Sequence, residues 1–228
     1  MDTLLAEDLL LLLLEDESGK LRHATYLDIG IGGALLVELA TTGQVDVRRG
    51  SGFWSRATVV PVPVAPAVTD PVLVDALAVI GEKARRAEDL VARLGKRRRE
   101  PLLERLAERG ILRRQDDAVL GLFPRTRWPM VDRHHEDAVR RALADALVRG
   151  VDPAPRTSAL ISLLSALDLA AKVVEHEGLS SGQVRKRARA IAEGDWAAKG
   201  VKDAVAAAQA AVAAAVMVST TAVTTTSG

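Results

Sequence analysis

A unit in which a helix ends at a glycine and leads into a strand occurs twice in this chain, and it constrains the fold more than any other feature. Residues 35–47 read LLVELATTGQVDV, and residues 102–114 read LLERLAERGILRR. In both copies the Leu-Leu-x-x-Leu-Ala spacing follows the helical period, and the glycine suits the left-handed position that closes a helix. Because a strand needs a pairing partner, each copy predicts a small β-hairpin after its helix.

The composition indicates a soluble, globular chain and excludes several kinds of site. Its 228 residues are 48% hydrophobic and 27% charged, which is enough to bury a substantial core. The net charge of +1 argues against attraction of nucleic acid over the whole surface. The absence of cysteine excludes disulfides, thiolate metal ligands and thiol catalysis. No two of the four histidines have the i, i+4 spacing of a helical zinc site, so no metal is predicted.

A run of leucines near the start, Leu9–Leu14, predicts a buried helix over about 4–15. Acidic residues flank the run on both sides, whereas a secretion signal begins with basic residues and a membrane span needs about 20 apolar residues. We therefore expect a cytoplasmic protein whose contact with a membrane is peripheral and at its inner face.

The hydrophobic periodicity predicts a mainly α fold, in which a single globular helical domain over 1–218 carries one or two small β-hairpins and a flexible tail follows over 219–228. Thr69 or Asp70 can cap a helix that has Pro71 at its first position. After the first repeated unit, further helices are predicted over 71–81, 82–94, 132–149, 157–174, 180–193 and 201–217.

Two hairpins are expected. Valine-rich strands over 44–48 and 58–64 flank a glycine turn and predict the first. The second, over 111–129, has an apolar arm that cannot easily bury both faces within one subunit. We therefore predict a homo-oligomer held in part by this hairpin. The apolar residues expected at its contact are Val119, Leu120, Leu122 and Phe123.

The segment from Lys83 to Arg114 is strongly basic, with twelve Lys or Arg against five Asp or Glu, and it includes four consecutive basic residues at 96–99. Two interpretations stay open. Ion pairs along a helix face could neutralise the charge, because glutamates lie at helical spacing from several of the arginines. Alternatively the four adjacent cations meet an anion, since like charges repel one another unless an anion lies beside them.

No catalytic motif is present, and the one glycine-rich segment has two explanations. Gly30–Gly33, which reads Gly-Ile-Gly-Gly ahead of the first repeated helix, could cradle a phosphate, but close helix packing is favoured. The sequence contains no Gly-x-Ser-x-Gly elbow, no Walker lysine after a strand and no nicotinamide-binding fingerprint. We therefore predict a binding or scaffold protein that is not an enzyme and has no cofactor.

Four blocks of the sequence resemble the Golgi phosphoprotein 3 family in its bacterial branch. They are Leu5–Leu12, Gly33–Ala40 followed by Gly43, Gly110–Leu112 with its hairpin, and Arg156–Ile161. The resemblance covers residues 3 to about 217 and implies a single, mostly helical domain with a small amount of β-hairpin. In the eukaryotic members it implies peripheral binding of phosphatidylinositol 4-phosphate and self-association through the hairpin.

The resemblance also implies a lipid pocket. In the family this pocket uses a tryptophan and an arginine around the first glycine-rich helix, and two basic residues before the second repeated helix. The basic pair falls on Lys96 and Arg99, the arginine position on Gly32 and the tryptophan position on His23. These four residues are therefore the expected contacts of an anionic phospholipid headgroup. Without the arginine the site lacks a fork-shaped phosphate donor, although a protonated His23 can meet a phosphate.

Two other classes of function remain as alternatives. In a winged-helix-like nucleic-acid binder, the arginine-rich segment would track phosphates. This class is disfavoured, because residues 102–107 alternate apolar and charged side chains in a way that mostly serves packing and ion pairing. The other alternative is an oligomeric scaffold without a lipid ligand.

Overall fold

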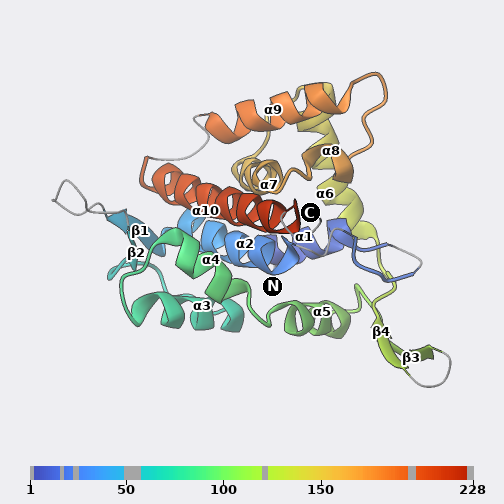
Figure 1. Ribbon diagram of the computed structural model, residues 1–228, viewed down its shortest axis with the longest axis horizontal. Coiled ribbons are helices and arrows are strands. Elements are labelled where there is room, and N and C mark those ends of the chain that lie inside the picture. The colour runs from blue at the N-terminus through green and yellow to red at the C-terminus, as the bar shows by residue number, and fades with distance from the viewer. Residues whose placement is uncertain are drawn as a thin grey trace.

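Helices make up most of the chain in the computed structural model, which describes residues 3–15, 18–22, 26–48, 58–119, 123–194 and 199–224. The predicted fold, a mainly α single domain with small β-hairpins, is confirmed (Figure 1). The helices are α1 (Leu5–Leu13), α2 (Leu27–Thr41), α3 (Pro71–Gly81), α4 (Ala87–Gly95), α5 (Arg99–Glu108), α6 (His134–Ala144), the π-helical turn η2 (Asp145–Arg149), α7 (Pro155–Ala166), α8 (Ala170–Val173), α9 (Ser181–Glu193) and α10 (Lys199–Thr224). The strands are β1 (Val45–Arg48) with β2 (Thr58–Pro61), and β3 (Gln115–Val119) with β4 (Phe123–Arg127).

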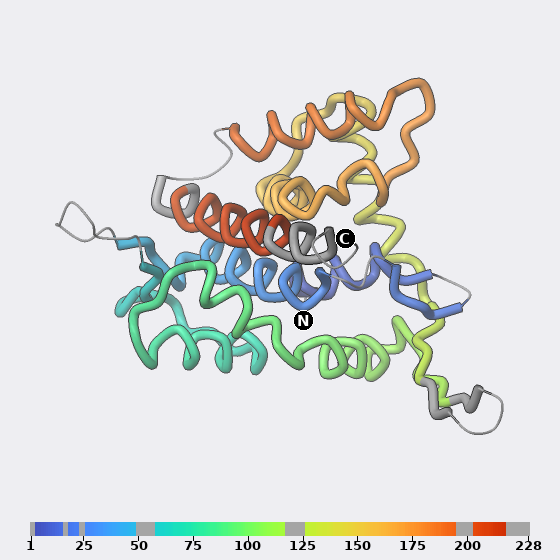
Figure 2. Tube along the Cα trace, in the orientation of Figure 1, coloured from blue at the N-terminus to red at the C-terminus, as the bar shows by residue number. Residues whose placement is uncertain are grey.

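The central helix of the domain is α2, and its sequence explains this position. Leucines, alanines and glycines cover it on nearly every side, so it has no broad polar face to present to solvent. It contacts α1, α4, α7 and α10 (Figure 1), and the trace in Figure 2 shows α10 running alongside it. The helix predicted from the leucine run is also confirmed, because all nine residues of α1 are buried.

Close backbone contact between α2 and α4 explains two of the glycines. A Cβ atom placed on Gly32 would lie 1.9 Å from the carbonyl oxygen of Val91. A Cβ atom placed on Gly95 would lie 1.6 Å from the carbonyl oxygen of Asp28. Side chains at these positions would therefore force the helices apart. The packing explanation of Gly30–Gly33 is right, but the segment lies inside α2 and not ahead of a helix, so it forms no phosphate cradle.

Both repeated units close as their glycines predict. Gly43 has φ +71° and Gly110 has φ +74°, in the left-handed region. At the end of α2 the backbone N–H of Gln44 donates to the Leu39 carbonyl at 2.8 Å. At the end of α5 the backbone N–H of Ile111 donates to the Leu106 carbonyl in the same way. The predicted cap of α3 is also present, since the Asp70 carboxylate accepts a hydrogen bond from the backbone of the first turn.

One helix boundary differs from the prediction because of a tertiary contact. α4 begins at Ala87 and not at residue 82. The segment between α3 and α4 instead lies against β2, where the Val59 amide donates to the Arg85 carbonyl at 2.8 Å. The Arg85 guanidinium in turn donates to the Val79 carbonyl at 2.7 Å, which fixes the turn against the end of α3.

Other boundaries shift in the C-terminal half. The helix predicted over 157–174 is divided into α7 and α8 at Asp168, which has φ +54°. The helix predicted over 132–149 ends in the π-helical turn η2. α10 crosses the predicted domain boundary at residue 218 and continues to Thr224. In the described part of the chain, no helix is both long and apolar enough to cross a membrane.

The hairpin of β3 and β4 projects from the body of the domain, at the lower right of Figure 1. Its base belongs to the core. Trp128 is only 4% exposed, and its amide donates to the Gly19 carbonyl at 3.2 Å. The ladder begins at Gln115, later than the expected start at residue 111. Before it, Leu112 forms only an isolated bridge with Met130.

Of the four residues predicted for an oligomer contact, the structure describes the backbone of Val119 and Phe123. Val119 pairs with Phe123 as the last pair of the β3–β4 ladder. Leu120 and Leu122 lie outside the described residues, as do the side chains of Val119 and Phe123. The predicted contact therefore remains a prediction.

Candidate functional site

A short basic turn, Lys96–Arg99, connects α4 to α5. Lys96 follows the last residue of α4, and Arg97 adopts the left-handed conformation with φ +59° before α5 begins at Arg99. Lys96 and Arg97 are both exposed. Neither has an ion-pair partner among the residues that the structure describes, so their charges are available to a ligand.

The other two cations of the basic turn have partners. Arg98 Nη1 lies 3.1 Å from Asp75 Oδ2 on α3. Arg99 Nη2 lies 3.7 Å from Asp28 Oδ1 at the start of α2, and both of these side chains are about half exposed. An exposed pair at this separation contributes little to stability. Arg99 can therefore exchange its carboxylate partner for a phosphate at small cost.

The two positions expected near the start of α2 do not complete a pocket in the described structure. Gly32 is buried in the contact between α2 and α4, with Val91 and Gly95 against its Cα. It neither faces the solvent nor leaves space for a side chain, which corrects its assignment as a lipid contact. His23 lies outside the described residues. Of the four expected contacts, the structure brings together Lys96 and Arg99 on the basic turn.

Two arginines near the end of α5, Arg105 and the C-cap residue Arg109, serve the fold. Arg105 Nε lies 2.9 Å from Glu7 Oε1, and its Nη1 lies 2.7 Å from Asp70 Oδ2. Arg109 also pairs with Glu7, whose side chain is fully buried in α1. Arg105 and Arg109 are therefore neutralised by ion pairs, but their partners are Glu7 and Asp70 and not the glutamates of the same helix that the sequence suggested. The signal that sequence reasoning missed is the adjacent acid pair Glu7 and Asp8 inside an apolar helix.

A second group of charges, the Asp8 cluster, joins α1, α2, α6 and α7, and places two buried carboxylates against two partly exposed cationic side chains. Its members are Asp8, Glu38, His135 and Arg156. Arg156 Nη2 lies 2.8 Å from Asp8 Oδ2, and its Nη1 lies 3.0 Å from Glu38 Oε1. His135 Nε2 lies 2.7 Å from Asp8 Oδ1. One arginine thus neutralises two buried carboxylates from different helices, so the cluster holds the core together.

The pKa values in the Asp8 cluster shift as its geometry requires. Burial raises the pKa of Asp8, but the hydrogen bond from His135 and the charge of Arg156 outweigh it, so the pKa falls below its ordinary value. The hydrogen bond to Asp8 raises the pKa of His135. Burial raises the pKa of Glu38, and the nearby charge of Arg156 offsets that increase only in part.

Comparison with known proteins agrees with the architecture. A protein-family model described as Golgi phosphoprotein 3 (GPP34) matches residues 5–208, from the start of α1 to within α10. Comparison with curated proteins gives no match. The part of the chain that the structure describes contains no group of three or more His, Asp or Glu that could hold a metal ion. With the family model matching most of its length, this chain belongs to the Golgi phosphoprotein 3 family.

Proposed function

We propose that this protein is a non-enzymatic peripheral membrane protein that binds the anionic headgroup of a phospholipid through the basic turn Lys96–Arg99. The proposal rests on one observation. In a segment where the buried carboxylate of Glu7 holds Arg105 and Arg109, Lys96 and Arg97 are exposed and lack ion-pair partners among the described residues. Adjacent cations that have no ion-pair partner repel one another, and this favours the binding of an anionic ligand.

The conformation of Arg97 supports the same function. A left-handed residue other than glycine costs about 1–2 kcal/mol, and such strain is concentrated at binding sites. Here it lies between the end of α4 and the start of α5, so that Lys96 and Arg99 come from adjacent ends of two helices. A headgroup phosphate at this turn would meet an ammonium group and a guanidinium group together.

The expected lipid preference is broad. Each basic residue near an anionic membrane surface contributes about 1 kcal/mol, so a small patch gives modest, salt-sensitive recruitment. Because Gly32 lies inside the α2–α4 contact, the site has no guanidinium from α2 to grip a headgroup phosphate in two places. We therefore expect phosphatidylglycerol and cardiolipin to bind with an affinity similar to that of phosphatidylinositol 4-phosphate.

A nucleic-acid function is less well supported. A recognition helix presents polar side chains to base edges, whereas α5 directs Arg105 and Arg109 onto Glu7 in the interior. Duplex DNA therefore serves as the competing ligand in the test.

Reversing two charges in the basic turn should remove membrane binding. We expect Lys96→Glu with Arg99→Glu to lower partitioning onto anionic liposomes by about thirtyfold or more, since two contributions of about 1 kcal/mol become repulsive. The measurement is co-sedimentation with phosphatidylglycerol, cardiolipin and phosphatidylinositol 4-phosphate liposomes at several salt concentrations. The melting temperature should change little, because the replaced groups are exposed or half exposed.

The matched control is Lys186→Glu with Arg189→Glu on α9, where two exposed cations have the same spacing. This variant should bind liposomes nearly as the unchanged protein does, because α9 lies on the other side of the domain from the basic turn (Figure 1). Equal losses in both variants would indicate a nonspecific charge effect. Binding that duplex DNA displaces, and that anionic lipid does not restore, would support the nucleic-acid alternative.

We also propose that the projecting hairpin joins subunits into a homo-oligomer. Val119 and Phe123 form the last pair of a ladder that extends away from the domain, and Leu120 and Leu122 lie between them in the sequence (Figure 1). Apolar residues at the end of an exposed strand pair are protected when they pack against another copy. The part to be altered ends before Trp128, because that side chain is buried in the core.

Replacing residues 117–125 with a two-residue Asn-Gly turn should lower the mass measured by light scattering to that of one 24.3 kDa chain. The helices should remain folded, since the pairs Gln115–Arg127 and Asp116–Thr126 and the buried base at Trp128 are kept. As a point variant, Val119→Asp with Phe123→Asp should have the same effect. The control is Val64→Asp with Val131→Asp, at apolar residues that are 93% and 59% exposed. An unchanged protein that is already monomeric at tens of micromolar would rule the proposal out.

A further inference from the structure

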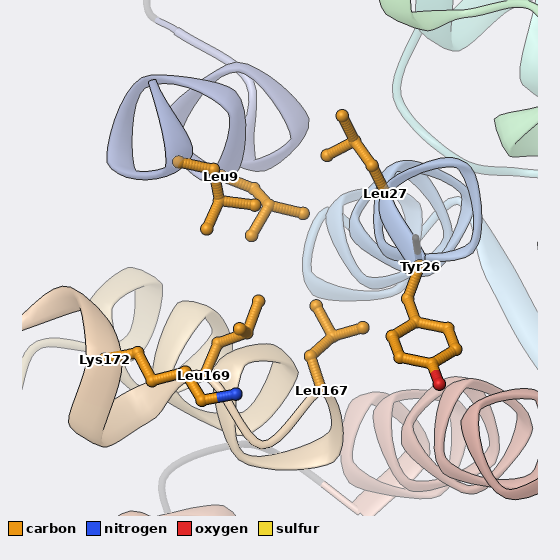
Figure 3. Close-up of a pocket in the computed structure, with 7 residues that line it drawn as sticks. Leu9, Tyr26, Leu27, Leu167, Leu169 and Lys172 are labelled. Carbon is orange, nitrogen blue, oxygen red and sulfur yellow. The ribbon is translucent and has the colours of Figure 1, made fainter. Parts of the chain in front are cut away.

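A small apolar cavity lies between α1, the start of α2 and the turn from α7 to α8 (Figure 3). Its volume is about 100 Å³. The walls are formed by five leucines, each of which is at most 6% exposed. They are Leu9, Leu13, Leu27, Leu167 and Leu169.

A tight turn shapes one wall of the cavity. Asp168 adopts a left-handed conformation with φ +54°, and the Leu169 amide donates to the Leu164 carbonyl at 2.8 Å. This is the helix-closing motif that usually employs glycine, here with aspartate at the left-handed position. Arg185 of α9 holds that aspartate at 2.8 Å. As a result, the residues on both sides of the turn, Leu167 and Leu169, line the cavity.

The mouth of the cavity is polar and carries one positive charge. Tyr26 is half-buried there, and Lys172 of α8 is exposed. Figure 3 shows the Lys172 side chain extending toward Leu169 and Leu167, with its ammonium group at the edge of the leucine cluster. No ion-pair partner for Lys172 exists among the described residues. The site therefore combines an apolar interior with an unneutralised cation.

These properties define the chemistry of an occupant. Protein interiors are close-packed, and an apolar void forfeits the contacts that its lining would otherwise make. Voids lined by leucine stay dry and accept apolar ligands instead of water. An ammonium group at the mouth adds a charge-assisted bond to an anionic end group. A single-chain carboxylate has both parts, a hydrocarbon segment and an anionic head.

We propose that this cavity binds the hydrocarbon end of a medium-chain fatty-acid carboxylate, with the carboxylate held by the ammonium group of Lys172. The site is separate from the basic turn Lys96–Arg99, and it uses different side chains. Its occupancy therefore does not depend on the function proposed above.

The test uses octanoate, with octanol as an uncharged analogue of the same chain length. Octanoate should bind the full-length protein in calorimetry and should shift the methyl NMR signals of Leu167 and Leu169. Lys172→Met keeps a side chain of similar length without the charge. It should weaken octanoate binding about tenfold and leave octanol binding unchanged, because only the charge-assisted bond is lost.

Two further variants make the outcome decisive. Leu169→Trp should weaken both ligands, because the larger ring fills the cavity, and Lys186→Met on α9 should weaken neither. Lys172 and Lys186 are both exposed, so their variants should fold even if the tryptophan variant does not. Absence of octanoate binding at millimolar concentration would overturn the proposal. Equal octanoate affinity in Lys172→Met and the unchanged protein would also overturn it. Lys96→Glu with Arg99→Glu should retain octanoate binding whether or not it loses liposome binding.

Discussion

Replacing Gly32 with alanine should destabilise the domain by about 3 kcal/mol, at the upper end of the usual cost of overpacking. The added Cβ would lie 1.9 Å from the carbonyl oxygen of Val91, and this neighbour is backbone, which cannot rotate away as a side chain can. Relief requires α2 and α4 to separate, with loss of packing around the central helix. Urea denaturation followed by circular dichroism would measure the change in unfolding free energy.

The control is Gly81→Ala at the end of α3, where an added Cβ would meet nothing within 4 Å. This substitution should be neutral or stabilising by up to about 1 kcal/mol, because alanine restricts the unfolded chain more than glycine does. If Gly32→Ala were equally well tolerated, the close approach of the two helices would be refuted. Arginine, the residue that the family resemblance implies at this position, should be tolerated even less than alanine.

Replacing Arg156 with methionine should cost about 2 kcal/mol of unfolding free energy, less than for a fully buried pair, because the guanidinium is 44% exposed and water screens part of its charge. Methionine keeps much of the volume but removes the cation shared by Asp8 and Glu38, whose side chains are 2% and 10% exposed. Breaking a buried pair is expensive because the remaining charge cannot regain its hydration. Here two carboxylates from neighbouring helices would be left close together, with only His135 to compensate.

The measurement for Arg156→Met is urea denaturation across a range of pH. The folded-state pKa of Asp8 is lowered in the unchanged protein, so its contribution is present above the unfolded pKa and is lost as the pH falls through the folded pKa. The difference between the two proteins should therefore be largest near neutral pH and should shrink below about pH 4. As a control, Arg149→Met breaks only the exposed pair with Asp145 and should change stability by about 0.5 kcal/mol or less. A loss for Arg156→Met no greater than this would show that the Asp8 cluster does not hold the helices together.

The two charge groups at α1 have a consequence for the surface. By pairing with Arg105 and Arg109, Glu7 reduces the positive charge that the segment from Lys83 to Arg114 presents to solvent. The exposed cations that remain include Lys96 and Arg97, which lie next to each other at the turn between α4 and α5. The same pairing that stabilises the core therefore leaves this basic turn as the candidate membrane contact.

Features with local causes follow from the amino-acid sequence alone. The leucine spacing, the left-handed glycines Gly43 and Gly110, and the Asp70 cap each act within one or two helical turns. Signals of this kind depend only on neighbours in the chain, so they can be read without a tertiary structure. They are enough to predict the mainly α fold, both hairpins and a basic turn that contains Lys96 and Arg99.

Long-range packing sets which charges are free and which glycines are confined. Arg105 and Glu7 are separated by 98 residues, and Arg156 and Asp8 by 148, so no local pattern connects them. A buried carboxylate must take its cation from whichever helix packs against it, and that choice sets which arginines remain for a ligand. Gly32 is a second case. It was expected to contact a ligand, but in the fold α4 packs against it, because the space around a glycine depends on the helix beside it.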